Sequence, residues 1–225
     1  MGVPTPLIVA LLQPMSGMPK IYLATSNAGK VREFREAAQA LAITLDPLPG
    51  LAGLPPAIED GVTFEENARI KAEYYSRFAP GEIVLAEDSG LAVDALNGAP
   101  GVYSARYAAV LQSGAASHEN SDDAANNLAL ITQLKQLPDK NFAGKYVCVI
   151  ALARDGQTMA TFTGEAHGEL ITSPRGAQGF GYDPFFYFPA LGKTFAELPL
   201  EQKREHSHRG KAFRHLLDWY SYRQF

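Results

Sequence analysis

Apolar residues recur about every 3.6 positions in four segments of the chain, and this period predicts helices with one face turned to a core. The second segment opens at Thr63, and Glu66 three residues later completes the sequence pattern of a capping box. That structural role accounts for Glu66, so we leave it out of the candidate site. The predicted inward faces are Val31, Phe34, Ala38 and Leu41 in the first helix, Phe64, Ala68, Ala72 and Tyr75 in the second, Leu128, Ile131 and Leu134 in the third, and Ala212, Phe213, Leu216 and Leu217 in the last, which covers roughly residues 210–222.

Strands are predicted between these helices. Residues 20–25 form a short strand-like run, and residues 83–86 are continuously apolar, as expected of a strand that is buried on both faces. The second run ends in Glu-Asp-Ser-Gly, after which residues 91–96 are apolar again. Residues 46–58 are rich in Pro and Gly, and we predict a loop there.

A hairpin is predicted in the second half of the chain. Residues 146–153 and 158–163 have strand character and flank Asp155-Gly156, a dipeptide typical of tight hairpin turns. Helix-separated strands together with a hairpin indicate an α/β fold with a mixed β-sheet flanked by helices. The chain has no internal repeat and no sign of a linker, so residues 18–225 are predicted to form a single domain.

The first 17 residues differ from the rest. Residues 7–12 are apolar, but this run is too short to span a bilayer, and no Lys or Arg precedes it as a signal peptide would require. A second methionine, Met18, stands just before the first predicted strand. We expect residues 1–17 to be a dispensable extension, and we expect no membrane partner.

Composition narrows the classes of function. Of the 225 residues, 46% are hydrophobic and 20% are charged, as in proteins that bury a sizeable core. The formal net charge of −4 argues against a nucleic-acid partner, although the sequence leaves room for a small basic pocket that binds one anionic ligand. The single cysteine, Cys148, lies in an apolar run, and we interpret it as a buried packing residue rather than a reactive thiol. A single cysteine cannot form an internal disulfide, and this indicates a protein of the reducing cytoplasm.

The first candidate binding segment is a small, polar turn between a predicted strand and a predicted helix. Small residues there leave backbone N–H groups open at a helix N-terminus, where the helix dipole favours an anion. A lysine follows in the first turn of the helix. A phosphate cradle and an ordinary strand–helix turn are both compatible with this pattern. The segment consists of Thr25, Ser26, Asn27, Ala28, Gly29 and Lys30.

The second candidate segment is Glu87-Asp88, which is followed by Ser89. Adjacent side chains of an extended chain point to opposite sides, so one carboxylate can face a crevice while the other packs. Buried carboxylates need a cation, and Mg²⁺ binds carboxylate and phosphate oxygens together. The alternative is a solvated turn in which Asp88 caps the chain. Glu59 and Asp60, before the second helix, supply further carboxylates.

The third candidate region lies late in the chain. Phe180 stands between two glycines, which leaves room for a flat ligand to approach the ring. Lys203, His208 and Arg209 concentrate positive charge near the start of the last helix, where anions bind well. The alternative interpretation is a solvated basic helix start.

Taken together, these segments resemble the inosine triphosphate pyrophosphatase family, also called the Ham1 family. The similarity extends from about residue 20 to residue 220, and the order of its six motifs is specific even though each motif alone is not. The motifs are Ala-Thr-Ser-Asn-Ala-Gly-Lys (24–30), Thr-Phe-Glu-Glu-Asn-Ala (63–68), Glu-Asp-Ser-Gly-Leu (87–91), Gly-Ala-Pro-Gly-Val-Tyr-Ser-Ala-Arg (98–106), Gly-Phe-Gly-Tyr-Asp-Pro (179–184) and Ser-His-Arg-Gly (207–210).

The resemblance implies an Mg²⁺-dependent enzyme that hydrolyses non-standard purine nucleoside triphosphates (ITP, dITP and XTP) to the monophosphate and pyrophosphate. It also implies a homodimer and an elongated two-lobed fold with the nucleotide in the cleft between the lobes. Asp88 would be the general base and a Mg²⁺ ligand, and Glu59, rather than Asp60, the second metal ligand. The implied substrate-binding residues are Thr25, Ser26, Asn27, Ala28, Gly29 and Lys30 at the triphosphate, Ser89 in contact with the substrate, Phe180 stacked on the purine, Asp183, His208 and Arg209 near the base, Lys203 at the nucleotide, and Gly181 and Tyr182 beside Phe180.

Two rival functions remain at this point. A pyrophosphatase of the related Maf type, acting on pyrimidine or modified nucleotides, would share the fold, but the motifs at 179–184 and 207–210 argue against it. A non-catalytic nucleotide sensor is the rival from another class, and the intact Asp88 and Lys30 argue against that.

Overall fold

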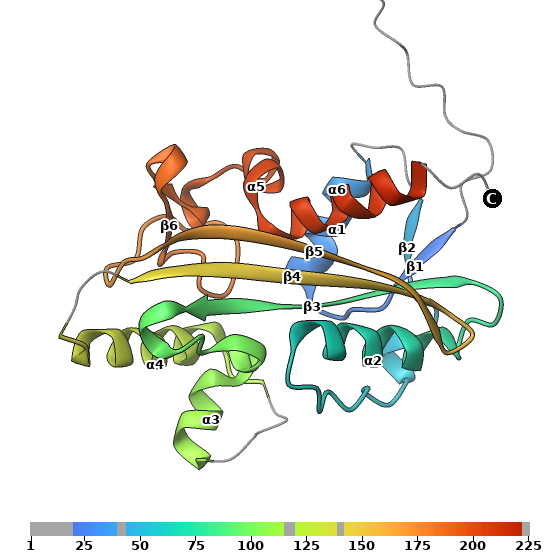
Figure 1. Ribbon diagram of the computed structural model, residues 1–225, viewed down its shortest axis with the longest axis horizontal. Helices are drawn as coiled ribbons and strands as arrows, with labels where there is room; N and C mark the ends of the chain where they lie inside the picture. The colour runs from blue at the N-terminus through green and yellow to red at the C-terminus, as the bar shows by residue number, and fades with distance from the viewer. Residues whose placement is uncertain (1–19, 40–43, 115–119, 139–141, 222–225) are drawn as a thin grey trace, which may run out of the picture.

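One sheet of seven strands runs through the molecule, with helices on both of its faces (Figure 1). The structure is a computed structural model, and it describes residues 20–39, 44–114, 120–138 and 142–221. The strands are β1 (Ile21–Leu23), β2 (Leu45–Pro47), β3 (Ile83–Val93), β4 (Ala143–Arg154), β5 (Gln157–Leu170), β6 (Phe186–Phe188) and β7 (Lys193–Thr194). The α-helices are α1 (Ala28–Gln39), α2 (Phe64–Ser76), α3 (Tyr107–Ser113), α4 (Asp123–Gln136), α5 (Leu200–His206) and α6 (His208–Ser221).

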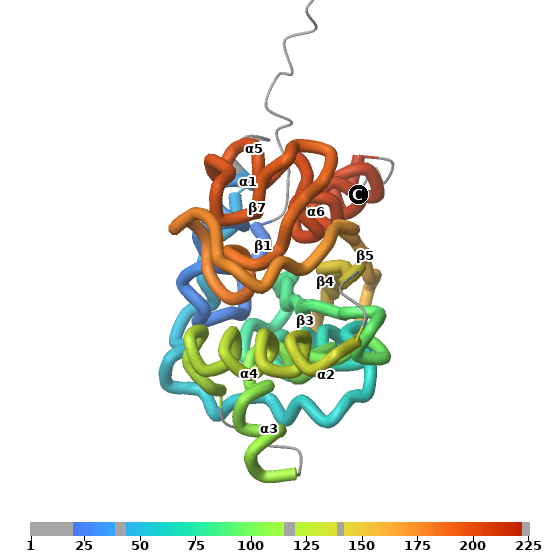
Figure 2. Tube along the Cα trace, turned by 90° about the vertical axis from the view of Figure 1, so that its left-hand side faces the viewer, coloured from blue at the N-terminus to red at the C-terminus, as the bar shows by residue number. Residues whose placement is uncertain are grey.

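The sheet is mixed, as predicted. Its strand order is β2-β1-β3-β4-β5-β6-β7; β1 is parallel to β2 and β3, and the remaining pairs are antiparallel. Helices α1, α5 and α6 cover one face, and α2, α3 and α4 lie on the other (Figures 1 and 2). The expected α/β class with a mixed sheet flanked by helices is therefore confirmed.

Buried side chains form three clusters that follow from this layering. The first lies between the sheet and α1 and α6 and includes Phe34 and Phe213, whose ring centroids are 5.9 Å apart. The second fills the far end of the sheet around Tyr146 and Phe186. The third packs Ala68 and Ala72 of α2 onto the alternate residues of β3 and β4. Burying these apolar faces is the main favourable contribution to folding.

The local signals at helix and hairpin ends are confirmed. Thr63 caps α2 by accepting a hydrogen bond from the N–H of Glu66, and the Glu66 carboxylate accepts one from the N–H of Thr63, which is the complete capping box. Asp155 and Gly156 both have positive φ angles, of 52° and 80°, at the turn that joins β4 to β5. Positive φ at both central residues is the geometry that such dipeptides favour.

Three predictions about the elements are wrong. The predicted loop at 46–58 begins inside β2, because Leu45 is buried and pairs with Ile21; Pro47 is tolerated since β2 is an edge strand. Strand β3 does not end before the acidic pair but continues through it. Leu128 is 69% exposed rather than inward, because α4 turns the polar Asn126 inward instead.

Other parts of the molecule were not predicted. Helices α3 and α5 and strands β6 and β7 are short and carry no long apolar period. Residues 1–17, Leu41 and the predicted helix end at 222 lie outside the described residues. Within the described ranges, no helix has the length and hydropathy needed to cross a membrane.

Candidate active site

The candidate site lies where β1 stops and β3 continues. Strand β1 pairs with residues 83–85 of β3, so Glu87 and Asp88 lie just beyond the end of their neighbour. Both acids are buried, Glu87 with 3% and Asp88 with 7% of the residue exposed. The alternative of a solvated turn at this position is wrong.

Asp88 points to the face covered by α2, where it meets a lysine. The ammonium of Lys71 lies 2.9 Å from Asp88 Oδ1 and 2.7 Å from Glu59 Oε2. Burial raises the pKa of Asp88 above its ordinary value, although Lys71 and Lys30 act in the opposite direction. Burial acts to lower the pKa of Lys71, but the nearby carboxylates of Asp88 and Glu59 have the larger effect. The pKa of Lys71 is therefore above its ordinary value. One cation is therefore shared by two carboxylates.

The residues present fit a Mg²⁺ ion. Glu59 and Asp88 supply carboxylate oxygens at one point, whereas Asp60 is exposed. One lysine leaves a net negative charge on the pair, so a second cation is electrostatically favoured there. Among the residues with described positions, no group of three or more His, Cys, Asp or Glu side chains could hold a metal. Two carboxylates suffice for Mg²⁺ when substrate phosphates complete its coordination.

Glu87 points to the opposite face, towards α1 and α6. Its Oε1 is paired with the ammonium of Lys30, and its Oε2 lies 3.7 Å from Arg209 Nη2. Burial opposes ionisation of Glu87, but Lys30 and Arg209 outweigh it and hold the pKa of this carboxyl far below its ordinary value. The thiol of Cys148 donates to Glu87 Oε2 at 3.5 Å, and burial raises the pKa of this thiol. Cys148 is buried, as predicted.

Glu33 of α1 connects the late basic residues to the sheet. Its Oε1 accepts from Lys203 Nζ at 2.6 Å, and its Oε2 accepts from Arg209 Nη1. Burial opposes ionisation of Glu33, but Arg209 and Lys203 lower its pKa to about 2. Lys203 also donates to Asp183 Oδ2 at 2.6 Å, and Arg209 Nη2 donates to Ser89 Oγ at 2.8 Å.

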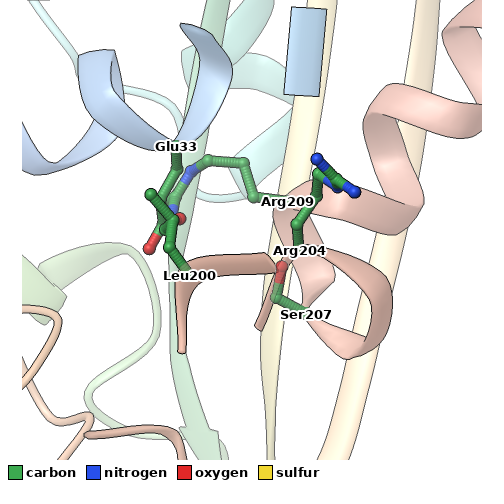
Figure 3. A pocket seen from close by; sticks show the side chains of 5 residues that line it. All are labelled: Glu33, Leu200, Arg204, Ser207 and Arg209. Carbon is green, nitrogen blue, oxygen red and sulfur yellow. The ribbon is translucent and has the colours of Figure 1, made fainter. Parts of the chain in front are cut away.

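Glu33 and Arg209 also border a small pocket between α1 and the start of α6 (Figure 3). Lys203, His208 and Arg209 are each only 3% exposed. The alternative of a solvated basic helix start is therefore wrong. The pocket is lined by Glu33, Leu200, Arg204, Ser207 and Arg209.

His208 differs from what the sequence indicated. We expected it to add positive charge, but burial and the nearby Arg209 hold the pKa of His208 well below its ordinary value, so the ring is neutral at pH 7. The imidazole is stacked on Tyr146, with centroids 4.6 Å apart and planes inclined by 8°. Its Nδ1 is buried without a hydrogen-bond partner among the described residues.

Close approaches between backbones place the first turn of α6. A Cβ atom on Gly164 of β5 would lie 2.2 Å from the carbonyl oxygen of His208, and one on Gly210 would lie 1.8 Å from that of Arg204. Neither position has room for a larger residue. Gly164 therefore allows α6 to lie directly on β5, and Gly210 allows the first turn of α6 to lie against the carbonyl of Arg204 in α5; these two contacts place Arg209.

Phe180 brings the first and third candidate segments together. A Cβ atom on Gly29 would lie 2.5 Å from the Phe180 ring, so the ring lies directly against the start of α1. Lys203 Nζ is 5.1 Å and Arg209 Cζ 5.5 Å from the ring centroid, within the range of cation–π attraction. The Phe180 N–H donates to Asp183 Oδ2 at 2.9 Å.

The strand–helix turn at 25–30 is ordered by its own side chains. Asn27 Oδ1 accepts from the N–H of Lys30 at 3.0 Å, and Thr25 Oγ1 accepts from the N–H of Asn27 at 3.3 Å. Asn27 thus acts as a cap for α1. This is compatible both with an ordinary turn and with an anion site, and Lys30 joins the turn to Glu87.

The structure therefore brings most of the predicted residues to one region, with Tyr182 pointing elsewhere. The Tyr182 hydroxyl donates to the carbonyl of Ser104 at 2.8 Å, in the core at the far end of the sheet. Sequence reasoning missed Glu33 and Lys71. Each stands one position before a buried residue of a predicted helix, Phe34 or Ala72, and neighbouring positions of a helix do not share a face, so the sequence carried no signal for either.

Comparison with known proteins gives a consistent picture. The model of the Ham1 family matches residues 21–219. A protein of Acidobacterium capsulatum named dITP/XTP pyrophosphatase is 51% identical over 197 residues, which cover 88% of this chain and 96% of that protein. A protein of the same name from Thermus thermophilus is 44% identical over 201 residues, or 89% of this chain and 91% of that protein.

Solved structures agree with these relatives. A HAM1 protein from Coxiella burnetii is similar with a TM-score of 0.76 and 37% identity, covering 91% of this chain and 99% of that one. The Ham1 protein of Staphylococcus aureus is similar with a TM-score of 0.73 and 38% identity, covering 90% of this chain and 98% of that one.

Proposed function

The chain belongs to the Ham1 family, and we propose that it hydrolyses non-standard purine nucleoside triphosphates, among them dITP and XTP, to the monophosphate and pyrophosphate. The observation that carries this proposal is the group formed by Glu59, Lys71 and Asp88, with Lys30 close by on the other side of β3. Two carboxylates and two lysines just beyond the end of β1 suit a ligand that is itself made of anionic phosphates and a divalent cation.

Glu59 and Asp88 would hold Mg²⁺, and Asp88 would also be the general base. A bound Mg²⁺ would withdraw charge from the phosphate oxygens that surround the attacked phosphorus. Asp88 would accept the proton of the attacking water, since a carboxylate at this place lies beside the proposed metal site. Pyrophosphate as the leaving group requires attack at the α-phosphorus.

The lysines would bind the triphosphate. Lys30 and Lys71 already neutralise Glu87 and Asp88 in the free protein, so their ammonium groups are held at the site before substrate arrives. Donors that are fixed in advance stabilise developing negative charge without reorganisation at the moment of reaction. The turn at 25–30 would contribute backbone N–H groups at the start of α1.

The base would lie at Phe180, beside Arg209 and His208. Arg209 Nε and His208 Nδ1 are both buried without a hydrogen-bond partner among the described residues of the free protein. A purine with a 6-keto oxygen offers an acceptor to such donors, whereas adenine offers a donor amino group and would leave the site's donors unpaired. A neutral His208 can donate from one ring nitrogen, depending on its tautomer.

We further propose a homodimer in the cytoplasm. Leu111 of α3 and Leu128 of α4 are 44% and 69% exposed, and a second copy would cover such apolar area. Light scattering after size-exclusion chromatography should give a mass about twice the 24.3 kDa of the chain. A mass near 24.3 kDa at all concentrations would contradict the dimer.

The direct test of metal dependence is turnover of ITP with the products identified. After treatment with EDTA and removal of the chelator, the protein should be inactive, and added Mg²⁺ should restore release of pyrophosphate and the monophosphate. Full activity in metal-free buffer would refute the role of Glu59 and Asp88. Release of orthophosphate alone would refute the reaction class.

A further inference from the structure

The turn that carries Phe180 is held from outside by helix α4. The N–H of Gly181 donates to Asp123 Oδ2 at 2.7 Å, and the carbonyl of Gly181 accepts from Asn127 Nδ2 at 3.1 Å. Asp123 and Asn127 are four residues apart, so they lie on the same face of α4, one turn from each other. The peptide groups on both sides of Gly181 are therefore bonded to one helix.

Gly181 is the second residue of a tight turn from Phe180 to Asp183. The N–H of Asp183 donates to the carbonyl of Phe180 at 3.3 Å, and Gly181 has a φ angle of 61°. Positive φ at this position of a turn strongly favours glycine. A Cβ atom on Gly181 would have no neighbour within 4 Å, so it is the backbone conformation and not lack of space that asks for glycine.

The position of this turn decides where the Phe180 ring lies. The N–H of Phe180 donates a hydrogen bond to the Asp183 carboxylate, and this carboxylate also accepts one from Lys203. The turn belongs to the loop that lies between α4 and α5 in Figure 2. Lys203 thus fixes the turn from the α5 side, and Asp123 and Asn127 fix it from the α4 side.

We propose that Asp123 and Asn127 are positioning residues for the purine base: by holding both peptide groups of Gly181, they keep Phe180 in the place where the base stacks. This inference rests on the proposed function, because it takes Phe180 as the base-stacking residue. In this proposal Asp123 and Asn127 act through Gly181 and not by direct contact with the substrate. Asp123 and Asn127 order the turn before the nucleotide binds, so that the entropy cost of ordering it does not reduce the affinity for the nucleotide.

A purely structural role for Asp123 is the alternative. It stands in the first turn of α4, where an acid stabilises any helix through the dipole. Its neighbour Asp122 has such a role within the helix, because its Oδ1 accepts from the N–H of Ala125 at 2.6 Å. Asp122→Ala is therefore the matched control, since it disturbs the start of α4 through a bond that does not involve the turn.

The experiment compares four variants in steady-state kinetics with ITP. Asp123→Ala removes the acceptor of the Gly181 N–H, and Asn127→Asp removes the donor to the Gly181 carbonyl. Each variant loses one hydrogen bond that orders the turn, so each should raise KM about tenfold. The kcat of both should stay within about twofold of wild type. Asp123→Asn keeps an acceptor oxygen and should stay within about threefold of the wild-type KM. Asp122→Ala should keep the wild-type KM while lowering the melting temperature.

Hydrogen exchange of the free protein gives a readout that does not depend on turnover. Peptides covering residues 176–185 should exchange faster in Asp123→Ala and Asn127→Asp than in wild type and Asp122→Ala. Unchanged exchange or unchanged KM in these two variants would overturn the proposal, and so would an equal rise of KM in Asp122→Ala. If the wild-type protein turned over no nucleoside triphosphate, both the proposed function and the positioning of the base by Asp123 and Asn127 would be refuted. The hydrogen-exchange rates would still show whether α4 holds the turn.

Discussion

Glu87 and Asp88 are adjacent in β3, yet their carboxylates lie on opposite faces of the sheet and meet different lysines. Glu87 is paired with Lys30, and Asp88 is paired with Lys71. Because β1 ends before this point, both pairs lie just beyond its end. Glu87 can thus hold the phosphate-binding Lys30 in place, while Asp88 binds metal and accepts a proton.

Asp88→Asn should abolish most turnover without unfolding the protein. The amide is nearly isosteric but cannot accept the proton of water and is a poorer metal ligand, so kcat should fall by about 10² to 10⁴-fold. Circular dichroism should confirm that the fold is kept. A variant that stays within a few-fold of wild type would move the general base elsewhere, and Glu87 would then be the next residue to replace.

Lys71→Met should make the free protein depend on metal for its stability. Without the ammonium, the carboxylates of Glu59 and Asp88 face each other with no cation between them. The free energy of unfolding should fall by about 2–4 kcal/mol. The loss is smaller than that expected for a fully buried pair, because Glu59 is partly exposed. Mg²⁺ should then raise the melting temperature more in Lys71→Met than in wild type. An equal rise in both proteins would contradict the sharing of one site by the lysine and the metal.

Glu33→Gln should lower stability in a pH-dependent way. The pKa of Glu33 is lowered from 4.5 to about 2, so its ionised form contributes to stability above about pH 4.5 and that contribution is lost as the pH falls through 2. At neutral pH the contribution is about 3 kcal/mol by linkage. The difference in unfolding free energy between wild type and Glu33→Gln, measured by urea titration from about pH 6 to about pH 2.5, should shrink as the pH falls. A constant difference would contradict the ion pairs with Lys203 and Arg209.

Deletion of residues 1–17 should leave activity and melting temperature nearly unchanged. The segment carries no helix or strand period and none of the six motifs. Differential scanning calorimetry and ITP turnover of the shortened chain provide the comparison. A large fall in melting temperature would show that the apolar residues 7–12 pack into the core.

Much of the fold was predictable because it depends on local signals. The α2 capping box, the β4–β5 turn and the apolar periods of α1 and α6 are each encoded within a few residues. Strand β2 was missed since its pairing with β1 is decided by distant residues and not by its own Leu-Asp-Pro sequence. Continuity of β3 through Glu87 and Asp88 was missed for a similar reason, because the cations that make it possible come from α1, α2 and α6.

The candidate site was predictable in its motifs but not in its pairing. Asp88, Lys30, Phe180 and Arg209 stand in the polar or glycine-rich segments that the sequence singles out. Glu33 and Lys71 look like ordinary exposed helix residues in the sequence. Only the packing of α1 against α6 buries Glu33, and only the packing of α2 against β3 leaves the Lys71 side chain no more than 11% exposed. The neutral state of His208 likewise depends on its stacking against Tyr146 and on Arg209, which sequence alone does not place.

The most direct test of the proposed function is kcat/KM for ITP, XTP, ATP and GTP, with pyrophosphate measured as product. We predict that ITP and XTP exceed ATP by orders of magnitude, because buried donors at Arg209 and His208 would be left unpaired by the amino group of adenine. GTP shares the keto oxygen, so its rejection needs a second contact at the 2-amino group and is expected to be weaker. Equal kcat/KM for ITP and ATP would contradict readout of the keto oxygen by these residues.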